Sequence, residues 1–452
     1  MIKNLFLSRD SSKKARVLIK LSSKQVLSIA GSDSGGGAGV QADLKTFSAL
    51  GVFGTTVVTS ITSQNTKSVD SVYDLPKEEI RNQINSVLED FKIRVIKIGM
   101  VHSKEIIEEV ASSLSNRDVK IVLDPVMVAE SGDLLLERDA VETFKDELLG
   151  ISEVLTPNSA ETQVISGIEI EDEESLLESG RRILELGPSN VVVTGGGIEG
   201  NDYLFNNDGV KKLEGEKFGV NSHGSGCTFS SAIASYLAKG FSVFEAVKKA
   251  QIFTKNSIKY SHEVGGGNRP VNQFAFCQKK ESRYSVLRNI DEAIKKLPES
   301  FKRLIPEVGT NLAMATKNPE NQNDVAGISG RIVSKKEEYE VVGCPRYGGS
   351  SHVARLILEA NGFDENIRSA INIGYGEDRV KTFREKGFSV SSFNRDDVSK
   401  ENTMSSGARK AIEEFGGVPD IIYDEGGVGK EPMIRVLGEK ATQVVDKTLK
   451  LL

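Results

Sequence analysis

Glycines and polar residues that could bind a small molecule are concentrated in residues 26–66. Five glycines, at positions 31, 35, 36, 37 and 39, follow an apolar run that predicts a strand. Because glycine has no Cβ atom, backbone amides there can approach a ligand, and Asp33, Asp43 and Gln64 lie where strand ends can direct them at it. Tight turns also use glycine for conformational reasons alone. The combination predicts a small-molecule site.

A second candidate site precedes the helical stretch 229–240. Amides at a helix N-terminus can hold an anionic phosphoryl group, and those available here belong to Gly224, Ser225, Gly226 and Cys227. Helix capping by Ser225 or Thr228 is a plainer reading, and both can hold. The helix dipole is expected to lower the pKa of Cys227 toward a thiolate. The alternative for Cys227 is a small, buried apolar side chain.

The elements that must position these residues alternate along 26–272. Amphipathic helical runs at 77–91 and 104–114 are interleaved with β-branched runs that lead into residues 97–100, 124–128 and 156–158. This alternation predicts right-handed crossovers and a mostly parallel, doubly wound sheet with helices on both faces. Parallel strands present their carboxyl ends at one edge. We therefore expect the ligand loops to meet there.

Length and composition limit the possible classes of protein. The 452 residues, 38% hydrophobic and 27% charged, suggest a soluble protein of two domains. A net charge of −6 argues against a dedicated nucleic-acid surface. Three cysteines without a C-x-x-C pair fit a reducing cytoplasm, and no apolar stretch approaches the ~20 residues that span a bilayer. Nucleic-acid and membrane partners are therefore not expected.

The chain divides into a tail and two expected domains. Residues 1–25 carry seven Lys and Arg against one Asp, a net charge of +6, and form a basic N-terminal tail without a secretion signal. A Gly-Gly-Gly-Asn-Arg-Pro sequence at 265–270 ends the helical pattern. We expect a first domain at 26–272, a linker at 273–284 and a second, smaller α/β domain at 285–452.

The first domain resembles the hydroxymethylpyrimidine (phosphate) kinases, members of the ribokinase-like superfamily. The resemblance rests on residues 26–66 and on four later segments, at 97–100, 124–128, 156–161 and 223–228. It implies ATP and Mg²⁺ as cofactors and Cys227 as the catalytic base. It further implies contacts of Asp43 and Gln64 with the pyrimidine edge, of Met100 and Val126 with the ring, and of Asp124 and Glu161 with metal and phosphates.

Two positions depart from the pattern of this family. Many relatives have a lysine where this chain has Thr194, and another where it has Glu130. Fewer positive charges then face the phosphates of ATP. We expect weaker compensation of phosphate charge, or compensation by a lysine elsewhere in the chain.

The second domain resembles the ThiN-type thiamine-phosphate synthases over its whole length. The resemblance is carried by residues 306–311, 325–333, 348–355 and 424–432, and it implies catalytic roles for Arg331 and His352. Gly-Gly-Ser-Ser before a helix at 352–360 offers one anion site, and the glycine-rich run 426–430 offers a second. The expected anion ligands are Ser350, Ser351, Gly427, Gly429 and Lys430. A surface arginine, a surface histidine and a simple turn are the plainer readings of these features.

Together the two resemblances imply a bifunctional enzyme of thiamine synthesis. It would phosphorylate hydroxymethylpyrimidine and its monophosphate and then condense the diphosphate with thiazole phosphate. The substrates are small molecules, and a homo-oligomer is expected. The alternative is a pyrimidine kinase with a non-catalytic, thiamine-phosphate-sensing domain, although the chain has no recognisable helix-turn-helix segment.

Overall fold

The structure is a computed structural model that describes residues 24–128, 135–194, 200–215, 219, 222–336, 338–395, 403–427 and 429–452. The chain forms two compact units, Met1–Phe276 and Cys277–Leu452. Almost all of the expected basic tail, and Glu130, lie outside the described residues. In the described part of the chain, no helix combines the length and apolar character needed to cross a membrane.

The first unit contains a nine-stranded sheet with the order β3-β2-β1-β4-β5-β6-β7-β8-β9. Its strands are β1 (Gln25–Asp33), β2 (Phe53–Gln64), β3 (Val69–Asp74), β4 (Val95–Ile98), β5 (Lys120–Leu123), β6 (Val154–Leu155), β7 (Val191–Val193), β8 (Asp202–Asn206) and β9 (Gly209–Leu213), with a separate pair, β10 (Ser222–His223) and β11 (Arg269–Pro270). The six neighbouring strands β2, β1, β4, β5, β6 and β7 pair in parallel. Strand β3 at one edge and strands β8 and β9 at the other are antiparallel additions.

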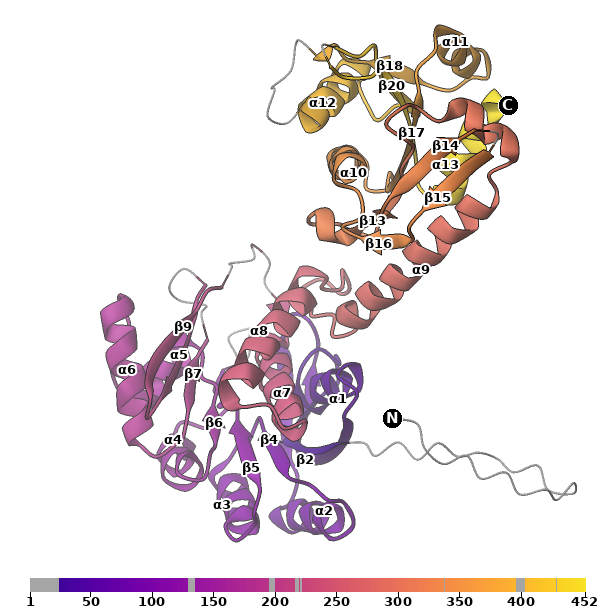
Figure 1. Ribbon diagram of the computed structural model, residues 1–452. Coiled ribbons are helices and arrows are strands. Elements are labelled where there is room, and N and C mark those ends of the chain that lie inside the picture. Colours follow the sequence, from indigo (N-terminus) through magenta and orange to yellow (C-terminus); the bar gives the residue numbers. More distant parts are fainter. Residues whose placement is uncertain are drawn as a thin grey trace, which may run out of the picture. The chain divides into compact units, whose positions relative to one another are not determined.

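Helices cover both faces of this sheet (Figure 1). They are α1 (Gly39–Ala49), α2 (Lys77–Asp90), α3 (Lys104–Leu114), α4 (Ala140–Phe144), α5 (Ser159–Ser166), α6 (Glu173–Glu185), α7 (Ser225–Ala238) and α8 (Val243–Lys259), with a π-helical turn at Lys145–Leu149. Apolar residues of α2 to α6 pack on one face of the sheet, and those of α1, α7 and α8 pack on the other. Because both faces are covered, the central strands are mostly apolar, with Ser28 in β1 and Lys97 in β4 as buried polar exceptions. The doubly wound fold predicted from the sequence is confirmed.

The second unit is built around a seven-stranded sheet with the order β16-β13-β12-β17-β20-β19-β18. Its strands are β12 (Leu312–Ala315), β13 (Val325–Ile328), β16 (Pro345–Tyr347), β17 (Ser369–Gly374), β18 (Val390–Ser392), β19 (Ile421–Asp424) and β20 (Met433–Gly438), and a hairpin is formed by β14 (Arg331–Lys335) and β15 (Glu338–Val342). Among the described strands of this sheet, only β18 and β19 pair in parallel. The sequence predicted an α/β domain but not this largely antiparallel order.

Helices also cover both faces of the second sheet. They are α9 (Ala275–Lys295), α10 (Ser351–Phe363), α11 (Glu377–Glu385), α12 (Thr403–Phe415) and α13 (Ala441–Thr448), with 3₁₀ turns at Glu299–Leu304, Gln322–Asp324 and Leu449–Leu451. Side chains of α10 and α12 pack on one face, and those of α9, α11 and α13 pack on the other. Most of the segment expected as a linker, 273–284, lies within α9. Residues 275–295 contain no Gly or Pro that would interrupt a helix, so the expected linker is helical rather than irregular.

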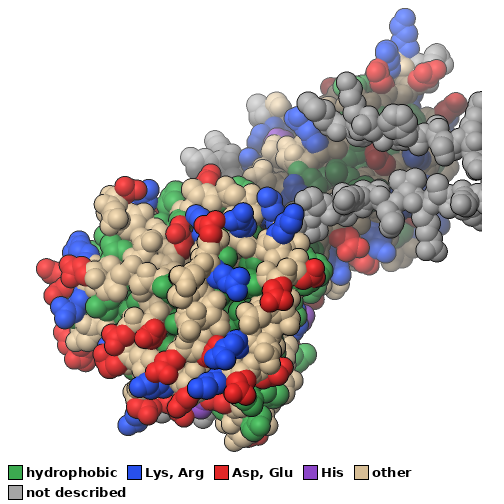
Figure 2. Space-filling view, turned by 90° about the horizontal axis from the view of Figure 1, so that it is seen from below, with side chains coloured by type: hydrophobic (Ala, Val, Ile, Leu, Met, Phe, Trp, Pro, Cys, Tyr) green, Lys and Arg blue, Asp and Glu red, His purple; other side chains and the backbone are tan. Residues whose placement is uncertain are grey.

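Acidic and basic side chains are mixed on the face of the first unit that Figure 2 presents. No broad area of one charge covers that face. This mixture agrees with the modest net charge of −6.

Candidate functional site

The first unit has a cavity of about 560 Å³ at the carboxyl ends of its parallel strands. The loops after β1, β4, β5, β6 and β7 line it, together with the N-terminus of α7 and one side of α8. Of the residues predicted for this site, the cavity contains Gln64, Met100, Asp124, Val126, Glu161, Gly224, Ser225, Gly226 and Cys227. The predicted convergence of these loops on one sheet edge is confirmed.

Asp33 holds the glycine-rich loop in place. Its carboxylate accepts hydrogen bonds from the amides of Gly35 (2.7 Å), Gly37 (2.9 Å) and Ala38 (2.8 Å). The His223 ring lies 3.0 Å away. Burial favours a raised pKa, but His223 and the loop amides outweigh it, so the pKa of Asp33 is lowered. Asp33 therefore remains charged and shapes the loop at the wall of the cavity.

The N-terminus of α7 depends on a glycine. Gly224 has a φ of +83°, and a Cβ atom on it would lie 1.8 Å from the carbonyl oxygen of Gly37. No side chain caps the helix from this position. Because the first-turn amides lack an N-cap side chain and face the cavity, they can receive an anion.

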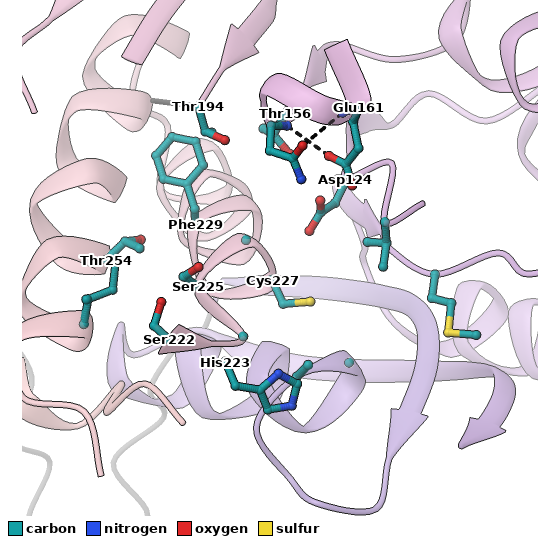
Figure 3. A pocket seen from close by; sticks show the side chains of 18 of the residues that line it. Asp124, Thr156, Glu161, Thr194, Ser222, His223, Ser225, Cys227, Phe229 and Thr254 are labelled. Carbon is teal, nitrogen blue, oxygen red and sulfur yellow. Dashed lines mark hydrogen bonds between the residues drawn. The ribbon is translucent and has the colours of Figure 1, made fainter. Parts of the chain in front are cut away.

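Cys227 points into the cavity from this turn (Figure 3). Burial raises the pKa of its thiol to about 12 in spite of Lys97, and the carboxylates of Asp124 and Asp43 add to the effect. The expectation of a thiolate near neutral pH is therefore wrong for the protein without ligand. Loss of solvation is the main cause, and the nearby carboxylates add to it because charges in a desolvated site act strongly at short range.

A buried ion-pair network lies beneath Cys227, and sequence reasoning missed its central residue. The Lys97 side chain is fully buried, 3.1 Å from both oxygens of Asp43 and 3.9 Å from Asp124. Burial opposes its charge, but Asp43, Cys227 and Asp124 outweigh burial and raise the pKa of Lys97. A lysine in an otherwise apolar strand, VIKI, was the available signal.

The structure corrects the role expected for Asp43. The Asp43 side chain is completely buried and does not line the cavity. Its oxygens accept hydrogen bonds from Ser28 Oγ (2.6 Å), Ser231 Oγ (2.6 Å) and Lys97. With every strong acceptor position in use, Asp43 cannot read the edge of a pyrimidine. It supports the site from below.

Asp124 and Glu161 bring two buried carboxylates to the cavity wall (Figure 3). Asp124 accepts a hydrogen bond from Ser230 Oγ (2.9 Å), and burial raises its pKa despite Lys97. Glu161 accepts from the amides of Asn158 (2.9 Å) and Met127 (3.2 Å), so it also caps α5. Burial, together with the charge of Asp124, raises the pKa of Glu161 to about 7. A cation bound between Asp124 and Glu161 would therefore favour the charged forms of both carboxylates.

Gln64, Met100 and Val126 line the part of the cavity that was expected to hold a ring. Gln64 Nε2 lies 3.5 Å from His223 Nε2. Val126 adopts a φ of +42°, which is rare for a β-branched residue and is typical of strained functional loops. Thr194 lies in the cavity as well, where its amide donates to the carbonyl of Pro157 (2.9 Å).

The second unit has its own cavity of about 670 Å³. It contains Arg331, Ser350, Ser351, His352, Gly429 and Lys430 of the predicted residues. Arg331 has a φ of +142°, a strained value for an arginine, and its guanidinium donates to the carbonyl of Val308. His352 lies in the first turn of α10, and Ser350 at the N-cap position leaves the helix amides without a side-chain cap.

Gly427 does not contribute to this cavity, contrary to expectation. Its amide donates to Lys430 O (3.0 Å), and the Lys430 amide donates back to Gly427 O (2.9 Å). The Gly426 amide donates to Asp424 Oδ1 (3.0 Å). The amides of Gly426, Gly427 and Lys430 thus already have acceptors, whereas Gly429 and Lys430 line the cavity.

Three arginines of the cavity were missed in the sequence: Arg355, Arg395 and Arg435. They come from α10, from the segment after β18 and from β20. Burial lowers the pKa of His352, and Arg355, Arg331, Arg435 and Arg395 lower it further. An excess of cations around a histidine indicates a site for an anionic ligand.

In contrast, His102 in the first unit faces a carboxylate. Its Nδ1 lies 3.2 Å from Asp74 Oδ2, which ties the end of β3 to the loop that carries Met100. The hydrogen bond with Asp74 raises the pKa of His102. This pair therefore stabilises the fold fully below about pH 6.5 and loses its effect as pH rises through the folded-state pKa.

We expect His102 and His352 to titrate at different pH values in an NMR pH titration. His102 should titrate above its ordinary value of 6.5 and His352 below it. Asp74→Asn should lower the pKa of His102 and leave that of His352 unchanged, which serves as the internal control. If both rings titrated together near pH 6.5, the predicted shifts of both pKa values would be wrong.

Comparison with known proteins identifies both units. Residues 33–272 match the phosphomethylpyrimidine kinase family, and residues 287–450 match the thiamine-phosphate synthase ThiN family. The bifunctional thiamine biosynthesis protein ThiDN of Methanocaldococcus jannaschii is 36% identical over 426 residues, which cover 93% of this chain and 97% of that protein.

Two further proteins resemble the first unit. A hydroxymethylpyrimidine/phosphomethylpyrimidine kinase of Staphylococcus aureus is 42% identical over 264 residues, 57% of this chain and 96% of that protein. The crystal structure of an ADP complex of Bacillus subtilis pyridoxal kinase matches with a TM-score of 0.53 and 34% identity, covering 57% of this chain and 99% of that one.

Proposed function

The chain belongs to the phosphomethylpyrimidine kinase family and carries a ThiN thiamine-phosphate synthase domain at residues 287–450, and from this we propose which reaction takes place in each of the two cavities described above. The first cavity binds ATP and phosphorylates hydroxymethylpyrimidine and then its monophosphate. The second joins the resulting diphosphate to thiazole phosphate, which yields thiamine phosphate and pyrophosphate. The observation that carries this division is that each unit has a cavity lined by groups that can bind phosphate, namely the first-turn amides of α7 in the first unit and several arginines in the second. The boundaries proposed are 26–272 for the kinase and 285–452 for the synthase.

In the first cavity, the pyrimidine lies against Met100 and Val126, with Gln64 at its polar edge. This places its hydroxymethyl group toward Cys227 and the first turn of α7. The amides of Ser225 and Gly226 hold the transferred phosphoryl group, and most of the catalysis is positioning and electrostatics. Cys227 accepts the proton of the attacking hydroxyl. Lys255, the described lysine that lines the cavity, compensates phosphate charge where Thr194 cannot.

Two of the carboxylates that line this cavity, those of Asp124 and Glu161, fit Mg²⁺. Among the described residues, no group of three or more acidic, His or Cys side chains is arranged to hold a metal ion. Asp124 and Glu161 alone, however, match the usual Mg²⁺ site, in which one or two carboxylates act together with water and substrate phosphates. Burial and the charge of Asp124 raise the pKa of Glu161, and a cation bound between the two carboxylates would favour their charged forms. Bound Mg²⁺ would neutralise developing phosphate charge, and Asp124 and Glu161 would hold it there.

In the second cavity, Arg331 and Lys430 bind phosphate groups, with Ser350 and Ser351 at the uncapped start of α10. His352 donates a hydrogen bond to the leaving diphosphate. The homo-oligomer expected from the sequence is proposed for the whole chain, and its mass in solution would test it.

The function is tested by incubating the full chain with hydroxymethylpyrimidine, Mg-ATP and thiazole phosphate, omitting one component at a time. We expect thiamine phosphate only in the complete mixture. Supplying the pyrimidine diphosphate directly bypasses the kinase. If product forms only then, the first cavity does not carry out its proposed reaction.

His352→Ala separates a synthase from a sensor of thiamine phosphate. Loss of a hydrogen-bonding group at the leaving diphosphate should lower condensation by about 100-fold or more. Binding of thiamine phosphate, measured by calorimetry, should change little. The kinase reaction of the same preparation is the control. Condensation at the full rate would show that His352 has no such role.

A further inference from the structure

One feature of the second cavity goes beyond the residues already given roles: two arginines share one buried carboxylate. Asp424 at the end of β19 is bound by Arg395 through Nε and, at 3.1 Å, through Nη2. Its Oδ2 also lies 2.6 Å from Nη1 of Arg435 on β20. The side chains are 0% exposed for Asp424, 6% for Arg435 and 13% for Arg395. The three side chains are therefore largely shielded from solvent.

The sheet places this group on the same face as His352. Along β20, Ile434 and Val436 point into the core under α13, whereas Leu437 packs with α10 and α12. Arg435 alternates with Ile434 and Val436, so it faces the α10 side. Both arginines line the cavity with His352, and both lower the pKa of that histidine.

The charges of this group do not balance. One carboxylate between two guanidinium groups leaves one positive charge without a partner in the cluster. Arg331 and Arg355, which are partly exposed, add two further cations, and the acidic residue among the described lining residues is Glu431. The Glu431 carboxylate already accepts from the amides of Glu307 (2.8 Å) and Val308 (3.1 Å). Two largely buried guanidinium groups that share one carboxylate are costly to keep charged unless an anion completes the site.

We propose that Arg395, held in place by Asp424 and Arg435, binds the diphosphate group of the pyrimidine substrate. This rests on the proposed synthase function and deepens it. In the condensation, the bond between the pyrimidine methylene carbon and the diphosphate oxygen breaks, and its electron pair remains on that oxygen. The lone pair of the thiazole nitrogen forms the new C–N bond. Negative charge thus develops on the diphosphate, where a fixed guanidinium stabilises the transition state most.

Each residue of the group has a distinct part. Arg395 presents its guanidinium to the cavity and is the residue that touches substrate. Asp424 and Arg435 are positioning residues, because Asp424 engages the Nε and Nη2 edge of Arg395 and leaves its other edge for a ligand. The thiazole phosphate, which keeps its phosphate throughout the reaction, has no such need for a fixed cation.

The test uses the full chain supplied directly with the pyrimidine diphosphate and thiazole phosphate. Arg395→Gln should lower kcat/KM for the diphosphate substrate by about 100-fold or more and weaken product inhibition by pyrophosphate. The KM for thiazole phosphate should change less than about threefold. Arg395→Lys keeps the positive charge but lacks the paired N–H donors of a guanidinium group, so it should recover part of the loss. Arg409→Gln, which removes an exposed arginine paired with Glu359 outside the cavity, is the matched control.

Other outcomes would overturn the assignment. A raised KM for thiazole phosphate with unchanged pyrophosphate inhibition would place that substrate at Arg395 instead. Unchanged kinetics in Arg395→Gln would make the cluster purely structural. If the melting temperature of Arg395→Gln is lower than that of the wild type, Arg395→Lys is used in its place. Full activity and full pyrophosphate inhibition in Arg395→Lys would show that the two-pronged guanidinium group is not needed. If the wild type makes no thiamine phosphate, the proposed function fails, but calorimetry of pyrophosphate with wild type and Arg395→Gln still decides whether Arg395 binds the anion.

Discussion

Replacing Lys97 with methionine is expected to destabilise the first unit by about 3–5 kcal/mol, the cost of removing one partner from a buried ion pair. Methionine fills a similar volume but leaves the carboxylates of Asp43 and Asp124 buried without their cation. Urea unfolding followed by circular dichroism measures the change. The transition of the first unit is identified by its shift when ATP is added.

Two further variants check the cause of that loss. Lys120→Met removes a lysine that is 54% exposed in its ion pair with Glu153, and it should change stability by less than about 1 kcal/mol. Adding Asp43→Asn to Lys97→Met should restore part of the stability, because one of the unpaired charges is then gone. A loss below about 1 kcal/mol in Lys97→Met would mean that the network does not depend on its lysine.

Replacing Cys227 with serine should lower kinase turnover by about 100-fold or more while the KM for hydroxymethylpyrimidine changes little. A serine hydroxyl has nearly the same size but is a much weaker acid than a thiol, so its conjugate base is scarcer. Because the pKa of Cys227 is raised to about 12, its thiolate fraction is small at neutral pH and increases as the pH rises. The kcat/KM of the wild type should therefore rise between pH 7 and 9.

The matched control for Cys227 is Cys344→Ser. Cys344 is an exposed free cysteine of the second unit, so its replacement should leave kinase kinetics unchanged. Equal turnover of Cys227→Ser and wild type would exclude the thiol as base. A flat pH profile together with a slow serine variant would instead make Cys227 a positioning residue.

The sequence alone determined the architecture of the first unit and the place of its cavity. Repeated β-branched and amphipathic runs are local patterns, and chain chirality leaves few ways to join them. The glycines around residue 35 and at Gly224 could be recognised for a similar reason: their backbone conformations and close approaches exclude a Cβ atom. Most of the predicted loop residues accordingly line the cavity.

Only the tertiary structure decided which charges meet. Asp43, Lys97 and Asp124 come from α1, β4 and the loop after β5, and nothing local to any of them reveals that they share one buried network. The same holds for Arg395, Asp424 and Arg435, which the largely antiparallel sheet of the second unit brings together. The pKa values of Cys227 and His352 follow from such neighbours. Electrostatic effects depend on distance through space and on burial, and a sequence records neither.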